Sequence, residues 1–362
     1  MARVPLCLFV IVLLACVPLR ADEKADKAQL EKDLQPKLVT IKDKEINVVK
    51  ALKAIHEQTG IEVLPPDDAD LVLKDLNLDK TPFWQAIDRI ALRGDLRVSL
   101  YGRDGKIALV KDEKGYREMP ISYSGLFRTT LKRVVVVRDL ETDAHYCLAK
   151  LEIAWEPRFQ AFLIDTRPES LEVTDDKGLT VEVPTIAKGP QQADGRIAVE
   201  LDLPLPALRR SSPKFGSIKG QLSITGSPKL LTFTFDKLAG KQEQMQEGVV
   251  CMLRNFREAK EIWTLDMALR YPPGGAKFES FQSWLINNQI YLLNKNGKRL
   301  DHAGYETDEQ GANTAQIRYR FADDDEKGVK LGKSADWRLI YRTPAQIAEV
   351  PIKFEFKDVL LP

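Results

Sequence analysis

One stretch of the chain occurs twice, and it limits the fold more than any other feature. The first copy runs from Tyr146 to Gly178 and the second from Ile262 to Gly297. Each copy has an alternating pattern that ends in an aromatic residue near a proline, then a phenylalanine-rich segment, then a second alternating pattern and a glycine turn. Alternation with period two is typical of strands with one buried face. The repeat predicts two similar all-β domains in tandem.

Later landmarks keep the same order in both copies. Alternating strands follow at Ile197, Val199, Leu201 and Leu203, and at Ala315, Ile317, Tyr319 and Phe321. Each copy then closes with two phenylalanines two residues apart, Phe233 and Phe235 in LTFTFDKL, and Phe354 and Phe356 in IKFEFKDV. Both members of such a pair point to one face of a strand. We therefore expect each pair in the core of its own copy, together with Trp155 or Tyr271.

These patterns predict β-sandwiches over residues 126–238 and 249–362, joined by a polar link at 239–248. Copies of this size, with several short strands and no strong helix, indicate immunoglobulin-like sandwiches. The Cys–Trp–Cys spacing of antibody-type domains is absent, so the strand topology stays open. Beyond tandem immunoglobulin-like sandwiches, this part of the chain resembles no particular family.

Residues 38–112 predict a small α/β module with internal symmetry. Apolar residues at helical spacing indicate two helices: Val48, Ala51, Leu52 and Ile55, then Phe83, Ala86, Ile87 and Ile90. Strand patterns flank both helices, so a β-α-β unit occurs twice. Gly60 predicts the end of the first helix. Thr81 predicts the N-cap of the second, with Pro82 at its first position. The fold class expected for the whole chain is α+β.

This duplicated strand–helix–strand pattern resembles the short N-terminal domain of secretins and TonB-dependent receptors. The resemblance covers about one fifth of the chain and depends on hydrophobic spacing rather than on invariant chemistry. It implies a periplasmic docking module. No long series of amphipathic membrane strands follows, so the resemblance implies a module and a compartment, not a secretin or a receptor.

The first residues carry an export signal. Arg3 precedes an apolar run over residues 5–17, and Ala21 stands before a charged stretch. This is the layout of a secretory signal peptide, and the run is short for a membrane span. We expect a signal peptide at 1–21 and a charged tether at 22–37. The alternative is a lipid anchor at Cys16, because Leu13-Leu14-Ala15-Cys16 resembles a lipobox. The mature chain is expected in the periplasm or outside the cell, without a transmembrane segment.

Net charge and cysteine content limit the possible partners and the possible disulfides. With 54 basic and 53 acidic residues the net charge is +1, so no overall field favours nucleic acid as a partner. Cys7 and Cys16 lie in the leader. Cys147 and Cys251 lie on apolar strand positions, which predicts two buried thiols. A disulfide between the copies is the alternative in an oxidising compartment.

No catalytic, cofactor-binding or metal site is predicted. His56, His145 and His302 lie in three different modules, and no GxSxG, HExxH, Walker or GxGxxG motif stands in a supporting context. The acidic runs at Asp67, Asp68 and Asp70 and at Asp323, Asp324, Asp325 and Glu326 lack the spacing of an EF-hand. We interpret both as solvated turns.

The remaining candidates for ligand binding are aromatic. Phe278, Phe281 and Trp284 lie close together and could stack on sugar rings if they are exposed. Phe159 and Phe162 occupy the equivalent place in the first copy. Positions shared by two copies of a fold are more often core, which is how we interpret all five.

The function expected from these features is that of an exported, non-enzymatic cell-envelope protein that binds or scaffolds an envelope protein partner. The alternative is a carbohydrate-binding or carbohydrate-processing accessory protein with a glycan ligand, which a row of exposed aromatics on one sandwich face would favour. A third reading is an enzyme with an unusual carboxylate site, which requires two or more carboxylates facing each other in a deep cleft.

Overall fold

The computed structural model describes residues 28–101, 105–112, 115–185, 189–193, 195–209, 211–272, 288–311 and 313–362. The expected signal peptide with Cys7 and Cys16 lies outside the described residues, as do Phe278, Phe281 and Trp284. The chain divides into two compact units, residues 1–35 and 36–362. In the first unit, residues 28–33 are helical. None of the helices in the described ranges is both long and apolar enough to be a membrane span.

The larger unit is mostly β-structure and begins with an α/β module. Its elements are β1 (Leu38–Asn47), α2 (Val48–Thr59), β2 (Val63–Leu64), β3 (Val72–Pro82), α3 (Phe83–Arg93), β4 (Leu96–Ser99) and β5 (Ile107–Lys111). Strands β1 and β3 pair antiparallel. Strand β5 pairs with β2 in parallel and with β4 antiparallel. The apolar faces of both helices are buried in one core with residues of these strands.

The residues at the helix ends explain where α2 and α3 begin and end. The side chain of Asn47 accepts hydrogen bonds from the N–H groups of Val49 and Lys50 and so caps α2. Gly60 ends this helix with φ of 73°, as its position predicts. The expected cap at Thr81 is wrong. Strand β3 continues to Pro82, so Thr81 is still a strand residue paired with Val39, and α3 begins without a side-chain cap.

A first β unit follows, with two sheets. One sheet has the order β13-β8-β7-β6 and the other β11-β10-β14-β9-β12, with β24 also paired to β14. The strands are β6 (Ile121–Ser124), β7 (Phe127–Arg138), β8 (His145–Trp155), β9 (Gln160–Asp165), β10 (Ser170–Asp175), β11 (Thr180–Val181), β12 (Pro190–Gln192), β13 (Ala198–Leu205), β14 (Lys214–Ser227) and β24 (Ala348–Leu360). The rings of Phe127 and Phe159 make an edge contact at 5.4 Å.

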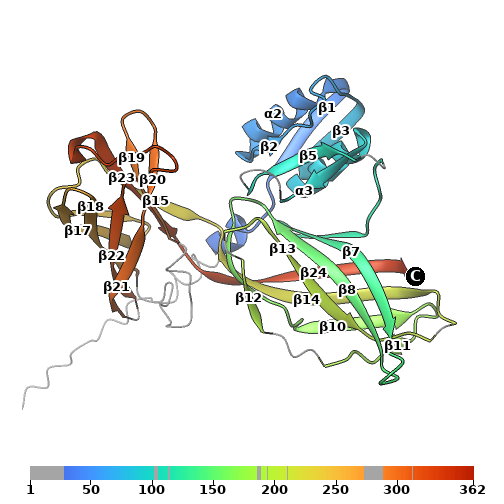
Figure 1. Cartoon of the computed structure of the whole chain (residues 1–362). Coiled ribbons are helices and arrows are strands. Elements are labelled where there is room, and N and C mark those ends of the chain that lie inside the picture. Colours follow the sequence, from blue (N-terminus) through green and yellow to red (C-terminus); the bar gives the residue numbers. More distant parts are fainter. Residues whose placement is uncertain are drawn as a thin grey trace, which may run out of the picture. The chain divides into compact units, whose positions relative to one another are not determined.

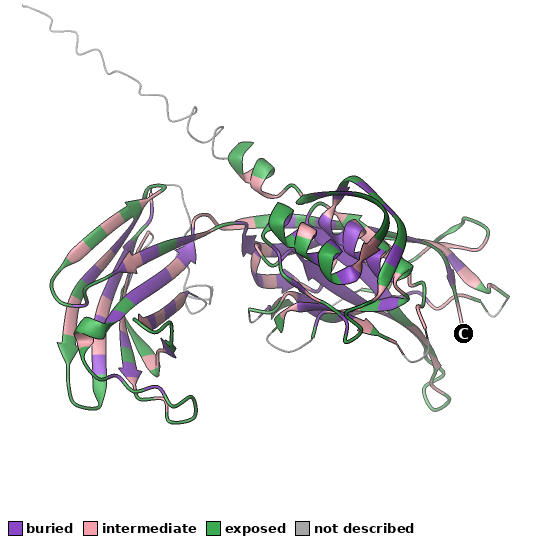
Figure 2. Cartoon of the chain, turned by 90° about the horizontal axis from the view of Figure 1, so that it is seen from above, coloured by how far each residue is buried: buried purple, intermediate pink, exposed green. Residues whose placement is uncertain are grey.

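A second β unit is built from sheets of the order β15-β23-β19-β20 and β16-β17-β18-β22-β21. Its elements are β15 (Leu230–Phe235), β16 (Gln242–Gln246), β17 (Val249–Glu258), β18 (Ile262–Arg270), β19 (Gln289–Asn294), β20 (Arg299–Asp301), β21 (Gly304–Gln310), β22 (Thr314–Ala322), the 3₁₀ turn η3 (Ser334–Asp336) and β23 (Trp337–Pro344). Strand β16 occupies the stretch predicted as a polar link. Buried positions alternate with exposed ones along the strands, as Figure 2 shows.

The two strands that carry Phe-x-Phe pair differently from the prediction. Strand β15, with Phe233 and Phe235, pairs with β23 of the second β unit. Strand β24, with Phe354 and Phe356, pairs with β14 of the first β unit. Figure 1 shows the red β24 beside β14 and apart from the orange strands that precede it in the chain. The expected assignment of each Phe pair to its own copy is therefore wrong.

One register runs through both pairings. In the pairing of β24 with β14, Leu360 lies opposite Lys214 and Ala348 lies opposite Gly226. In the pairing of β23 with β15 the same register continues, with Pro344 opposite Leu230 and Leu339 opposite Phe235. Between the two pairings the N–H of Ala345 donates to the carbonyl of Lys229 at 3.0 Å, also in register. Strands β14-β15 and β23-β24 thus form one antiparallel ribbon that passes from one β unit into the other. We call it the crossing ribbon.

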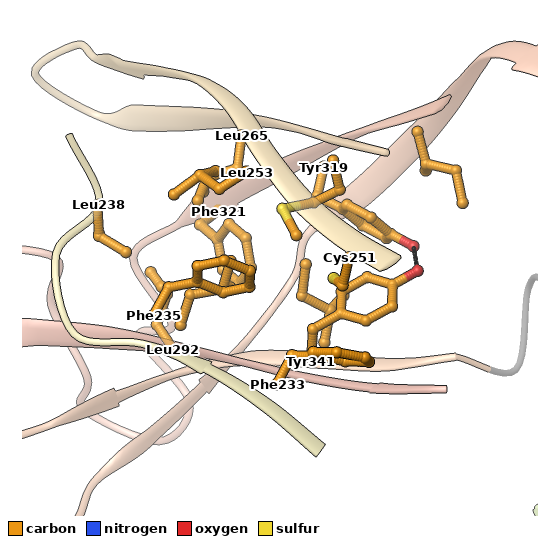
Figure 3. Packing of buried hydrophobic residues seen from close by; sticks show 14 of the residues in the cluster. Phe233, Phe235, Leu238, Cys251, Leu253, Leu265, Leu292, Tyr319, Phe321 and Tyr341 are labelled. Atoms are coloured by element: carbon orange, nitrogen blue, oxygen red, sulfur yellow. Dashed lines mark hydrogen bonds between the residues drawn. The ribbon is translucent and has the colours of Figure 1, made fainter. Parts of the chain in front are cut away.

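The Phe residues are buried as predicted, but in exchanged surroundings. Phe233 and Phe235 belong to the core cluster of the second β unit, beside Cys251 and Phe321 (Figure 3). On the other side, the ring of Phe354 covers Gly220 of β14, where an added Cβ would lie 2.5 Å from the ring. Trp155, Tyr271, Phe354 and Phe356 are also buried. The alternating pattern thus predicted the buried face correctly, but not the neighbouring strand.

Polar side chains cover the outer edges of the crossing ribbon. Gln244 and Gln246 of β16 donate to the carbonyls of Thr234 and Thr232 on β15, at 2.6 and 2.7 Å. On β24 the N–H groups of residues 353 and 355 donate to Ser124 and Ser122 of β6, at 3.2 and 3.1 Å. Backbone groups left open at an edge strand invite pairing with other chains. The glutamines and serines satisfy these groups within the chain.

Candidate functional site

A cleft with a volume of about 660 Å³ lies beside helix α3. Its wall combines the helix, the segment that leads into β6, and one residue of β24. The lining residues are Gln85, Asp88, Arg89, Leu92, Tyr116, Glu118, Met119, Pro120, Ile121, Tyr123 and Lys357. We call it the α3 cleft. Lys357 reaches it because β24 belongs to the first β unit.

Asp88, in the wall of the α3 cleft, forms an ion pair with the buried Arg128. Arg128 of β7 is only 3% exposed. Its Nε and Nη2 donate to the two carboxylate oxygens of Asp88 at 2.8 and 2.9 Å. Such a two-pronged contact is the strongest geometry for a carboxylate and an arginine. It offsets the cost of removing both charges from water, and it fastens α3 to β7.

A second carboxylate lies on the other side of the same arginine. Glu152 of β8 is buried, with Oε1 3.7 Å from Nη1 of Arg128 and Oε2 3.2 Å from Nζ of Lys132. Nη1 also donates to Thr130 Oγ1 at 2.8 Å. Burial alone would lower the pKa of Arg128, but the charge of Asp88 and its hydrogen bonds raise it overall. Arg128 therefore stays charged at any pH at which the protein is folded.

Two tyrosines line the cleft above the ion pair. The hydroxyl of Tyr123 donates to Asp88 Oδ2 at 2.7 Å. Burial, and then the negative charge of Asp88, raise the pKa of Tyr123 well above its ordinary value, so the phenol remains protonated and keeps donating. The N–H of Tyr116 donates to Asp95 Oδ1 at 2.6 Å, which holds the segment entering the cleft. Burial also raises the pKa of Tyr116.

A tryptophan completes the contact between α3 and the first β unit. Trp84 is 2% exposed, and its indole N–H donates to the carbonyl of Leu126 at 3.1 Å. Its ring also lies 6.0 Å from the guanidinium carbon of Arg128, within range of a cation–π contact. Trp84, Asp88 and Arg128 together hold the wall of the cleft in place.

The α3 cleft presents charged, aromatic and apolar side chains to a ligand. Asp88 accepts from Arg128 and from Tyr123, and Glu152 faces two cations, so each carboxylate is held beside a cationic group. The surface that remains includes Tyr116, Tyr123, Met119 and Arg89, which are residue types enriched at protein interfaces. Leu92 adds an apolar side chain that is 54% exposed.

The histidines and acidic runs lie where the sequence predicted. His56 is exposed on α2, His145 is exposed at the start of β8, and His302 is half-buried after β20. Asp68 Oδ1 accepts from the N–H of residue 70, and Asp324 Oδ1 from that of residue 327, as in ordinary turns. Within the described ranges no group of three or more His, Cys, Asp or Glu residues could hold a metal ion.

The cysteines and aromatic candidates have structural surroundings. Cys147 and Cys251 are buried free thiols. Burial raises the pKa of Cys147 to about 11 and that of Cys251 still further. Phe159 and Phe162 are buried, as predicted. The exposed large aromatics among the described residues are Tyr101, Tyr123, Tyr146 and Tyr305. They lie on β6, β8, β21 and the turn after β4, and form no row on one sheet.

Sequence reasoning missed the α3 cleft and its ion pair. Asp88 and Arg128 are 40 residues apart, and neither belongs to a motif. A signal was nevertheless present at Arg128. It lies near the start of the stretch predicted as the first sandwich, where a charged side chain facing inward needs a partner.

No family model, no curated protein and no solved structure matches the chain. The α3 cleft must therefore be interpreted from its own geometry.

Proposed function

We propose that the protein is an exported cell-envelope protein that binds a protein partner and has no enzymatic activity of its own. The apolar leader at residues 5–17 supports export. The α/β module, with its order β1-α2-β2 followed by β3-α3-β4-β5, supports a duplicated docking module similar to the short domain of secretins and TonB-dependent receptors. The two β units are then immunoglobulin-like sandwiches that support the module.

The observation that carries this proposal is the composition of the α3 cleft. Arg89, Leu92, Tyr116, Met119 and Tyr123 meet in one concave surface. Tyrosine and arginine are enriched among the residues that supply most of the binding energy at protein interfaces, and methionine is enriched at such interfaces. The bonds of Asp88 to Arg128 and Tyr123 hold this surface rigid before the partner arrives, which lowers the entropic cost of binding.

Site-specific photo-cross-linking in the native host tests the proposal. A photoreactive phenylalanine analogue in place of Leu92, at the rim of the cleft, should give a discrete adduct with one envelope protein. The matched control is Leu140, which is 83% exposed in the turn between β7 and β8. Equal adducts from both positions, or none from Leu92, would contradict a docking role for the cleft.

Export is tested separately by mass spectrometry of the protein from its native source. The expected result is a new N-terminus at Asp22, or an acylated Cys16 if the leader is a lipobox. Mature protein that retains Met1 would overturn the export part of the proposal and leave the cross-linking result intact.

A further inference from the structure

A second cavity lies where the crossing ribbon passes from one β unit to the other. Its volume is about 350 Å³, within the range of small-molecule sites. Arg158 and Arg196 line it from the first β unit. Lys229 comes from the link between β14 and β15, and Arg342 from β23. We call it the ribbon cavity.

The charge of the ribbon cavity is one-sided. Four cationic side chains and two glutamines, Gln160 and Gln289, line it, and no carboxylate is found among the described residues that form its wall. The whole chain has nearly equal numbers of basic and acidic residues, 54 and 53. Two of the cations have carboxylate partners outside the wall, Lys229 with Glu247 and Arg158 with Glu156, whereas Arg342 donates to the neutral Gln289. An anionic ligand that enters the cavity is attracted by the positive charge of its wall.

Two of the arginines are positioned by contacts with neighbouring side chains. Nη1 of Arg342 donates to Oε1 of Gln289 at 2.9 Å. This amide is neutral, so the bond orients the guanidinium without cancelling its charge. Nε of Arg158 donates at 2.6 Å to Glu156, whose side chain is fully buried and also accepts from the N–H of Lys37. Both guanidinium groups are thus held in fixed orientations.

We propose that the ribbon cavity binds a small ligand through an oxyanion group, a carboxylate or a phosphate. The planar fork of arginine donors matches both groups and can bind them with two parallel hydrogen bonds. Arg196 and Arg342 both line the cavity but lie on different β units, so a ligand that fills the cavity contacts both units. Binding of the ligand therefore also stabilises the junction between the two β units.

Calorimetric titration of the full-length mature protein tests the proposal, with inorganic phosphate and sodium glucuronate as probes at constant ionic strength. We expect saturable binding of at least one probe. Arg342→Gln should weaken that binding about tenfold or more, because it removes a charge-assisted hydrogen bond. A phosphate preference would indicate a phosphate ester as the ligand, and a glucuronate preference an acidic sugar. Either result supports an oxyanion site.

The matched control is Arg254→Gln on β17. Arg254 also donates through Nη1 to a neutral glutamine, Gln316, at 2.6 Å, and it does not line the ribbon cavity. This variant has the same change of charge and should leave the affinity unchanged within about twofold. The proposal is overturned if neither probe binds the wild type, or if Arg254→Gln weakens binding as much as Arg342→Gln.

Discussion

The two β units differ in how the chain enters them. The second β unit is continuous in sequence, from β15 at Leu230 to β23 at Pro344. The first is split, because β24 at residues 348–360 completes a sheet whose other strands end at Ser227. The second β unit is thus inserted between two neighbouring strands of the first. A repeat in the sequence therefore need not correspond to a repeat of independent domains.

The crossing ribbon is what makes the insertion stable. Its strands keep one register through both β units, and each strand contributes apolar side chains to both cores. Val350, Ile352, Phe354 and Phe356 of β24 are all buried. The chain leaves the first β unit and returns to it at adjacent points, since Gly226 pairs with Ala348. Domain insertion is well tolerated when the chain ends it separates lie close together.

The largest expected effect comes from deleting residues 348–362. The first β unit would lose the strand that pairs with β14 and several buried side chains, which together exceed the stability of a typical domain. We expect amide hydrogens of β7, β8 and β14 to lose protection in hydrogen exchange, while those of β17, β18 and β22 keep it. Loss of protection in the second β unit instead would support tandem, independent copies.

Deleting the second β unit tests whether the first β unit folds without it. Gly226 pairs with Ala348, so replacing residues 227–347 by a two-residue Asn-Gly turn would join β14 directly to β24 as a hairpin. The α/β module and the first β unit should then still unfold cooperatively in a thermal melt. A non-cooperative transition would mean that the first β unit depends on the second for more than the ribbon.

Truncating a single phenylalanine should destabilise the β unit in which its ring is buried. This is not the β unit to which chain order would assign that phenylalanine. Phe235→Ala should cost roughly 3–5 kcal/mol in the second β unit, and Phe356→Ala a similar amount in the first, since both rings are buried. Hydrogen exchange resolved by peptide would assign each loss to a β unit. If each change loosened its own sequence copy, the exchanged pairing would be wrong.

A smaller effect is expected at Gly220, where the ring of Phe354 lies against the backbone. An added Cβ would lie 2.5 Å from Phe354 Cζ, so Gly220→Ala should cost about 1–3 kcal/mol through overpacking. Phe354→Leu in the same chain should recover part of this loss. Gly189→Ala is the control, because its added Cβ would meet no atom within 4 Å. Denaturant melts of the wild type and these three variants check the coupling.

Acid should destabilise the second β unit through His302. Burial lowers the pKa of this imidazole below its ordinary value of 6.5. The folded state thus binds the proton less readily than the unfolded state, so stability is full above pH 6.5 and falls as the pH drops through the lowered pKa. Melting temperatures measured over this range should fall less steeply for His302→Gln. An identical pH dependence in both proteins would exclude His302 as the cause.

The smallest effect is expected at Glu355, which lies between the two buried phenylalanines of β24 and points to solvent. Its side chain is 47% exposed, and its 3.4 Å contact with Lys357 is a surface ion pair. Glu355→Lys should change the free energy of unfolding by less than about 0.5 kcal/mol. A cost close to that of Phe356→Ala would mean that the register of β24 is wrong.

Sequence reasoning recovered what local patterns determine. Alternation at Phe233 and Phe235 gave the buried face, and helical spacing at Ile87 and Ile90 gave the apolar face of α3. It failed on the choice of strand neighbour, because LTFTFDKL and IKFEFKDV have the same pattern and either fits beside β14 or β23. Only the contacts of whole sheets distinguish the two pairings.

The candidate sites were beyond the reach of local patterns for a similar reason. The α3 cleft depends on Asp88 meeting Arg128 across 40 residues, and on Lys357 arriving with an exchanged strand. The ribbon cavity needs Arg196 and Arg342 to converge from different β units. Lys357 and Arg342 reach these sites because they lie on β24 and β23 of the crossing ribbon.

Disulfide trapping tests the crossing ribbon most directly. Gln221 lies opposite Lys353, whereas in a local hairpin of β14 and β15 it would lie opposite Asp236. Two full-length proteins are needed, one with cysteines at 221 and 353 and one with cysteines at 221 and 236. The native thiols of Cys147 and Cys251 are buried with raised pKa values and should not compete.

Mild oxidation followed by peptide mass spectrometry of the monomeric fraction gives the answer. The crossing ribbon predicts an intramolecular disulfide between positions 221 and 353, formed rapidly and nearly completely, and none between 221 and 236. Rapid bonding of 221 to 236, with no bond to 353, would contradict the exchanged pairing and the insertion that depends on it.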